Sequence, residues 1–189
     1  MNISALEISS TIGLIAAIAT TVNICLGLLI AVRYDPQRDW PRVRLNIFAI
    51  HNSSAYPALV LVAAHPLLLL AVRQPQWTIM QIALPAWSPV QPAINSVGAL
   101  GLYLLIVLIV SSYFRRHLGF RRWKVLHYLV YAAAACIFIH GILANPTLSA
   151  GPIDPLDGEK LLVEGCLLVV IAASISAWRI RARRRFPKR

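Results

Sequence analysis

The sequence predicts an all-α integral membrane protein, a bundle of five transmembrane helices with its N-terminus outside and its C-terminus in the cytoplasm. Of its 189 residues, 58% are hydrophobic and only 13% are charged. The mean hydropathy is +0.68, far above that of a soluble globular domain. The apolar residues also gather in five runs, each close to the about 20 residues that a helix needs to cross the hydrocarbon core.

The five predicted spans follow one another with short connections. The first begins at Thr11 and lacks the positive start of a signal peptide, so we expect it to stay in the membrane. The second contains Pro57 and Pro66 and is not expected to be an ideal rod. The spans are residues 11–32, 45–72, 93–114, 125–144 and 161–178. We expect residues 1–180 to form one bundle and residues 181–189 to form a basic cytoplasmic tail.

Basic residues gather in the connections on one side of the spans. Of the 18 Lys and Arg residues, only Arg73 and Lys160 lie on the other side. The rest are Arg33, Arg38, Arg42, Arg44, Arg115, Arg116, Arg121, Arg122, Lys124, Arg179, Arg181, Arg183, Arg184, Arg185, Lys188 and Arg189. The positive-inside rule makes their side cytoplasmic. The net charge of +11 therefore reflects membrane orientation, and we expect no nucleic-acid partner.

Two predicted connections outside the membrane have distinct compositions. Residues 74–92 are semi-apolar, and Trp77 and Trp87 suit a short helix lying on the outer surface. Residues 145–160 are rich in turn formers and acids, which favours a solvated loop. A docking surface for a partner or a cation is the alternative for this loop.

Four of the five histidines fall inside predicted spans, where ionisable residues are costly and usually have a partner or a function. His51 and His65 lie in the second span, and His127 and His140 lie in the fourth. These two spans run in the same direction, so His51 and His127 lie near the inner side and the other two near the outer side. The separations are about 21 Å and about 20 Å along the helices. Two stacked bis-histidine sites are therefore predicted.

The rotation between the histidines differs in the two spans. His51 and His65 fall within about 40° of each other, whereas His127 and His140 miss by about 140° in an ideal helix. A bulge, a kink or ligands held at different angles would have to absorb that difference. Hydrogen-bonded packing is the alternative for any single membrane histidine.

Haem iron suits such pairs, because it accepts two axial imidazoles and its porphyrin suits an apolar slot between helices. Zinc favours sites with further donors, which neither pair has. The expected ligand atom is Nε2, with Nδ1 bonded to a backbone or hydroxyl group. Arg44, Arg121 and Arg122 are candidate partners for the propionates, with membrane orientation as the alternative role for each.

The histidine spacings and the segment RRHLGFRRWKVLHYLVYAAAACIFIHGIL resemble the ferric reductase-like transmembrane domain shared by NADPH oxidases and ferric reductases. The pattern is His-x13-His in one span and His-x12-His two spans later, with a basic-LG-x-x-x-W-x-x-LH-x-x-x-Y run entering the fourth. The resemblance covers about residues 33–179. It implies an inner haem b held by His51 and His127 and an outer one held by His65 and His140.

The sequence also departs from the complete oxidases and reductases, which continue into flavin and nicotinamide domains. It carries no GxGxxG or other cofactor fingerprint. We therefore expect a stand-alone bacterial member, similar to the haem membrane subunit that feeds electrons to a periplasmic methionine-sulfoxide reductase. That subunit is described with six spans and a flavin link, whereas a flavin has no support in this sequence.

The leading hypothesis is a di-haem electron-transfer subunit of a bacterial inner membrane, an oxidoreductase component that needs a partner for full activity. A cytoplasmic flavoprotein reductase or quinol would supply electrons to an external acceptor: ferric iron, oxygen or a periplasmic oxidoreductase. Glu164 is interpreted as an interfacial acid, with proton movement as the alternative. Two rival functions stay open, a cytochrome b anchor of a periplasmic dehydrogenase that reduces quinone, and a non-haem metal-binding or structural membrane protein.

Overall fold

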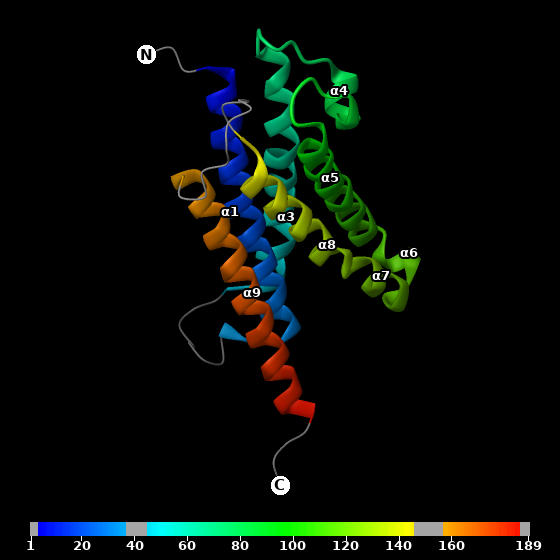
Figure 1. Cartoon of the computed structure of the whole chain (residues 1–189). Helices are drawn as coiled ribbons and strands as arrows, with labels where there is room; N and C mark the ends of the chain where they lie inside the picture. The colour runs from blue at the N-terminus through cyan, green and yellow to red at the C-terminus, as the bar shows by residue number, and fades with distance from the viewer. Residues whose placement is uncertain (1–3, 37–44, 146–156, 186–189) are drawn as a thin grey trace.

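A computed structural model of the chain describes residues 4–36, 45–145 and 157–185. All regular structure in these ranges is helical, and five of the helical segments are long and apolar enough to cross a membrane (Figure 1). They are Ala5–Ala31, Ile47–Ala71, Pro92–Tyr113, Phe120–Leu143 and Gly158–Arg184. The all-α class and the five spans are confirmed, and the chain is a multi-pass membrane protein. The side that each terminus faces stays a prediction.

Helix α1 (Ala5–Ala31) begins six residues before the predicted first span. The Ser4 hydroxyl accepts a hydrogen bond from the Glu7 amide at 3.2 Å, and the Glu7 carboxylate accepts one from the Ser4 amide at 2.8 Å. This capping box satisfies amides that would otherwise lack partners at the helix start. Polar residues thus extend the helix beyond the apolar run from which the span was predicted.

Helix α3 (Ile47–Leu67) starts at Asn46, whose side-chain oxygen accepts a hydrogen bond from the Ala49 amide at 3.0 Å. It contains Pro57 and Pro66 and passes into the 3-10 turn η1 (Leu68–Ala71) directly after the second proline. Proline removes a helical hydrogen bond, so the tighter turn follows the point where the α-helical ladder is interrupted.

The fourth span is two helices, α7 (Phe120–His127) and α8 (Leu129–Leu143), separated at Tyr128. The Tyr128 amide donates to the Lys124 carbonyl at 3.3 Å and to the Val125 carbonyl at 3.2 Å. The α-helical hydrogen bond to the fourth residue before it is therefore long, and the amide shares it with the third. The break lies between His127 and His140. The span is therefore not an ideal helix, and the rotation of about 140° between the two histidines that was calculated for one does not describe it.

Two shorter features frame helix α5 (Pro92–Tyr113). On the predicted outer side, α4 (Ile79–Ala83) and the 3-10 turn η2 (Pro85–Trp87) form the expected short helical stretch. On the predicted inner side, the single turn α6 (Arg115–Leu118) leads through Gly119 into α7. Gly119 has φ of +74°, a conformation that other residues rarely adopt.

The two tryptophans of the connection before α5 lie in different environments. Trp87 is 65% exposed, as a residue at the membrane surface would be, whereas Trp77 is only 7% exposed. Trp77 is thus covered by other parts of the protein, and the position of both residues relative to the membrane surface stays a prediction. Most of the loop predicted at residues 145–160 lies outside the described residues.

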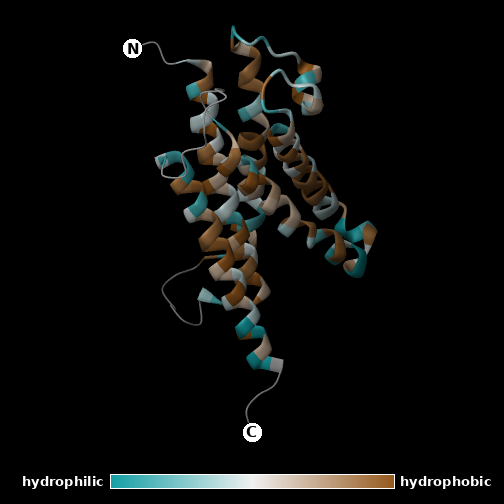
Figure 2. Ribbon diagram, viewed as in Figure 1, coloured by the Kyte–Doolittle hydropathy of each residue, from teal (hydrophilic) through white to brown (hydrophobic). Residues whose placement is uncertain are grey.

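The spans form two groups that meet along the histidines. Helix α1 packs on α3 and on α9 (Gly158–Arg185), while α5 packs on α8 (Figure 1). One cluster of buried residues in the described part of the chain consists of Ile24, Ala134, Phe138, Val163 and Val170. Apolar residues dominate the middle of the bundle, and hydrophilic ones gather toward its ends (Figure 2). Many large apolar side chains are exposed, among them Val60, Leu168 and Val169. Such a surface is expected where lipid is the solvent.

We predict that valine at Gly101 destabilises the contact between α5 and α8. A Cβ at Gly101 would lie 2.9 Å from Ile137 Cγ1, closer than packed atoms approach. Overpacking of this kind costs about 1–3 kcal/mol, so thermal unfolding in detergent should begin at a lower temperature. Gly165→Val is the matched control, because nothing lies within 4 Å of a Cβ at that position. Equal unfolding temperatures for both variants would contradict this account.

Candidate functional site

The four membrane histidines lie in the structure as two pairs. The ring centroids of His51 and His127 are 6.4 Å apart with an interplanar angle of 80°. Those of His65 and His140 are 6.1 Å apart with an angle of 68°. Each pair joins α3 to the span made of α7 and α8. The structure thus puts each histidine beside the partner that the parallel topology predicts, and what the pairs bind stays a prediction.

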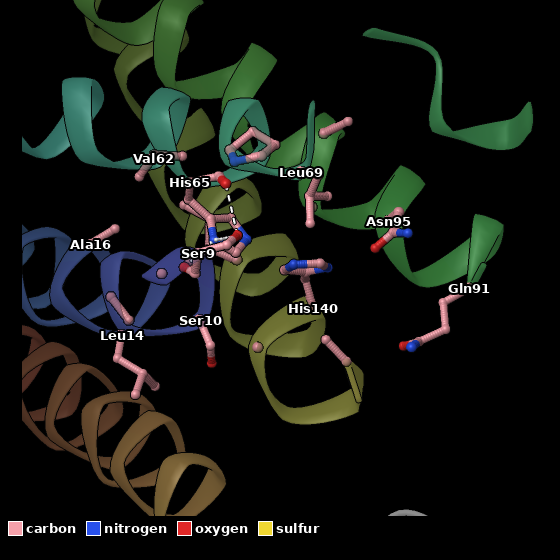
Figure 3. Close-up of a pocket in the computed structure, with 18 of the residues that line it drawn as sticks. Ser9, Ser10, Leu14, Ala16, Val62, His65, Leu69, Gln91, Asn95 and His140 are labelled. Carbon is pink, nitrogen blue, oxygen red and sulfur yellow. Dashed lines mark hydrogen bonds between the residues drawn. The ribbon is translucent and has the colours of Figure 1, made fainter. Parts of the chain in front are cut away.

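The outer pair lines a cavity of about 200 Å³ (Figure 3). Its walls come from α1, α3, α5, α8 and α9 and are mainly apolar, with Trp77 among them. Polar side chains, including Gln91 and Asn95, also line it. Lys160, which is only 4% exposed, is the basic residue of this lining. The site is an apolar slot with a few polar groups in its wall.

The inner pair lines a larger cavity of about 570 Å³. Aromatic and basic side chains contribute much of its wall. The aromatic ones are Phe48, Tyr56, Tyr113, Phe120, Trp123, Tyr128 and Tyr131. The basic ones are Arg115, Arg116, Lys124 and Arg181. An apolar cavity with cations in its wall suits a flat ligand that carries anionic groups.

These basic residues differ from those that the sequence suggested. Arg44 lies outside the described residues, and Arg121 and Arg122 are not among the residues that line the inner cavity. Helical periodicity explains the difference, because Lys124 lies about 60° around α7 from His127 while Arg122 lies about 140° away. Sequence proximity to the histidine was a poorer guide than position on its helix face.

Three of the four histidines direct Nδ1 at a backbone carbonyl. The carbonyl of Asn23 is 3.0 Å from His51, that of Ser9 is 2.7 Å from His65, and that of Ile94 is 2.9 Å from His140. A ring that donates from Nδ1 to a carbonyl is the tautomer whose Nε2 holds a free lone pair. Each of these three rings therefore has an Nε2 whose lone pair is not used by a hydrogen on that atom.

A glycine lies four residues after each of these carbonyls and touches the same ring. A Cβ at Gly13 would lie 3.0 Å from His65, one at Gly27 would lie 3.2 Å from His51, and one at Gly98 would lie 2.8 Å from His140. We call each unit of carbonyl and glycine a glycine cradle. Only a residue without a side chain leaves room for the ring there.

Sequence reasoning missed the cradles, although a signal for two of them was available. Gly13 and Gly27 are 14 residues apart, the same spacing as that of His51 and His65. On antiparallel neighbouring helices, equal spacing lets two glycines face two histidines at matching depths.

Polar side chains of α1 reinforce its two cradles. The Ser9 hydroxyl donates to the His65 carbonyl at 2.8 Å (Figure 3). The Asn23 amide donates to the His51 carbonyl at 2.7 Å and to the Ser54 hydroxyl at 2.9 Å. Each histidine of α3 is thus bound to α1 through both its ring and its backbone.

His127 is the exception among the four. Its Nδ1 is buried and has no hydrogen-bond partner in the part of the chain that the structure describes. Its ring instead packs on that of Trp123, with centroids 5.0 Å apart and an angle of 30°.

Other candidate residues do not join these sites. Among the described residues, no group of three or more His, Cys, Asp or Glu side chains could hold a metal ion. Glu164 is half-buried on α9 and lines neither cavity. The role of Glu164 as an interfacial acid stays a prediction.

Comparison with families of known proteins places most of the chain in one of them. A family model described as "Ferric reductase like transmembrane component" matches residues 13–138, more than half of the chain. The matched region includes His51, His65 and His127 and ends two residues before His140. No curated protein and no solved structure matches the chain.

Proposed function

Because the chain belongs to the ferric reductase like transmembrane family, we propose that it carries electrons across a membrane through two b-type haems. His51 and His127 would be the axial ligands of the inner haem, and His65 and His140 those of the outer haem. The membrane electron-transfer role follows from the family, while the two haems and their ligands are our proposal.

The separation of the paired rings carries this proposal. Two imidazoles on opposite sides of one metal ion, each bonded at about 2.0 Å, have ring centroids roughly 6 Å apart. The observed separations are 6.4 Å and 6.1 Å. Both separations match that value. Edge-to-face packing of two rings falls in the same range of about 4.5–7 Å, so haem content is the measurement that decides between ligation and packing.

The surroundings of the pairs support haem over a closed zinc site. Neither pair has the third and fourth donors that structural zinc requires, among the residues that the structure describes. The inner cavity, about 570 Å³, falls within the about 300–1,000 Å³ of typical ligand pockets. The outer cavity, about 200 Å³, is smaller. The number of haems per chain is thus the quantity to measure.

The basic wall residues of the inner cavity suit the propionates of a haem. Arg115, Arg116 and Lys124 line this cavity, whereas Lys160 shares the outer wall with the carboxylates Asp157 and Glu159. Charge-assisted hydrogen bonds from such residues to a carboxylate are shorter and stronger than neutral ones. In this arrangement the haem supplies the redox chemistry, and the chain supplies ligation, orientation and an apolar setting that tunes the potential.

The direction of transfer in this proposal follows the predicted orientation. A cytoplasmic flavoprotein reductase or quinol would reduce the inner haem, and an external acceptor would oxidise the outer one. The basic residues beside the inner cavity suit an acidic flavoprotein or anionic lipid. In a bacterium, the chain would accordingly lie in the inner membrane.

The test is the spectrum of the full chain purified from haem-sufficient cells. Dithionite reduction should produce the α and Soret bands of a b-type cytochrome, and the pyridine haemochrome should give two haems per chain. A protein that holds no haem would refute the proposal. One haem per chain would contradict the assignment of a haem to both histidine pairs. His117→Ala is a matched control, because His117 is exposed and lies outside both cavities.

A further inference from the structure

The inner and outer sites differ in how their histidines are held. His51, His65 and His140 each lie in a glycine cradle, whereas His127 has no carbonyl at Nδ1 and no described glycine within 4 Å of its ring. A carbonyl that accepts a hydrogen bond from Nδ1 orients an imidazole and makes its Nε2 a stronger ligand for a metal ion. His127 therefore lacks both the fixed orientation and the strengthened Nε2 of the other three histidines.

The place where a fourth cradle would lie is occupied by other groups. Thirteen residues after Ile94 and Gly98, the spacing of His140 and His127, helix α5 carries Val107 and Ser111, with Ser112 next to them. The Ser112 hydroxyl accepts a hydrogen bond from Trp123 Nε1 at 3.2 Å. Trp123 in turn packs on the ring of His127. The ring is thus restrained by an aromatic face, which fixes orientation less tightly than a hydrogen bond.

The backbone at His127 is also less regular than at the other histidines. His127 is the last residue of α7, directly before the break at Tyr128, whereas His51, His65 and His140 lie within continuous helices. The ring of His127 is therefore restrained less by its own backbone than the other three rings are.

We propose that His127 is a displaceable axial ligand and that the inner haem iron, when reduced, binds a small neutral ligand such as carbon monoxide in its place. His65 and His140, both held in cradles, would keep the outer site closed. This inference rests on the proposed function. With a haem bound, His127 Nε2 would give up its place on the inner iron to the incoming ligand, with no change of oxidation state.

Carbon monoxide binding to the dithionite-reduced full chain in detergent tests this directly. About half of the reduced α-band should convert to the carbon monoxide form, because one of two equally abundant haems reacts. Conversion of neither haem, or of both together, would overturn the inference. A chain without haem would instead refute the proposed function before any gas is added, so the two failures are distinguishable.

Three variants assign the reactive haem. Trp123→Ala removes the restraint on His127 and should raise the affinity for carbon monoxide roughly tenfold, the effect of losing one modest interaction. Ser112→Ala should act in the same direction with a smaller effect, and it keeps the packing of Trp123. Gly98→Ala crowds His140 and should make the second haem reactive.

Gly165→Ala is the control and should change neither haem, since its Cβ would meet nothing within 4 Å. An unchanged affinity in both Trp123→Ala and Ser112→Ala would overturn the role of His127. The same conclusion would follow if Gly98→Ala altered the haem that already reacts in the unmodified chain.

Discussion

Alanine at His65 and alanine at His140 should each remove the same haem from the chain, leaving one of two. The reason is that the rings lie 6.1 Å apart across one cavity, so the loss of either ligand leaves a single imidazole to hold the iron. Alanine at His51 should remove the other haem, whose two ligands are 6.4 Å apart. Pyridine haemochrome content and low-temperature reduced spectra measure the loss.

The double variants make this prediction sharper. His65→Ala with His140→Ala should retain as much haem as either single variant, since both substitutions affect one site. His65→Ala with His51→Ala should retain none, because the substitutions affect different sites. A pattern in which His65 and His127 share a haem would show that the pairing is wrong. His117→Ala should keep both haems and serves as the control.

Leucine at Gly13 should remove the outer haem, and leucine at Gly27 the inner one, although neither glycine is a ligand. A Cβ at Gly13 would already lie 3.0 Å from His65 Nδ1, and one at Gly27 would lie 3.2 Å from His51 Cε1. The added side chain must displace the ring from its carbonyl acceptor. This breaks the hydrogen bond from Nδ1 and changes the direction in which Nε2 points. We expect each variant to retain about one haem per chain.

A matched glycine separates this effect from general disruption. Gly165 lies on α9 with nothing within 4 Å of a Cβ, so Gly165→Leu should keep both haems and normal yield. Retention of two haems by both Gly13→Leu and Gly27→Leu would show that the cradles do not position the rings. Loss of the haem on the opposite side would contradict the assignment of glycines to histidines.

The apolar runs and the position of the histidines were sufficient to predict the five spans and the two stacked pairs. Where the spans begin was less predictable, because a start such as that of α1 depends on a polar capping box that hydropathy does not detect. The burial of Trp77 was not predictable for a related reason. An aromatic residue near a span suits both the membrane surface and a cavity wall, and only its neighbours decide between them.

Composition and periodicity alone determined that this chain lies in a membrane, because both reflect the free energy of transferring side chains to lipid one residue at a time. Only the tertiary structure decided how the histidines are held. The break at Tyr128, the three glycine cradles and the missing fourth depend on contacts between helices that are distant in sequence. A single glycine in an apolar run carries no sign of the ring that will lie against it, since that contact exists only once two helices pack.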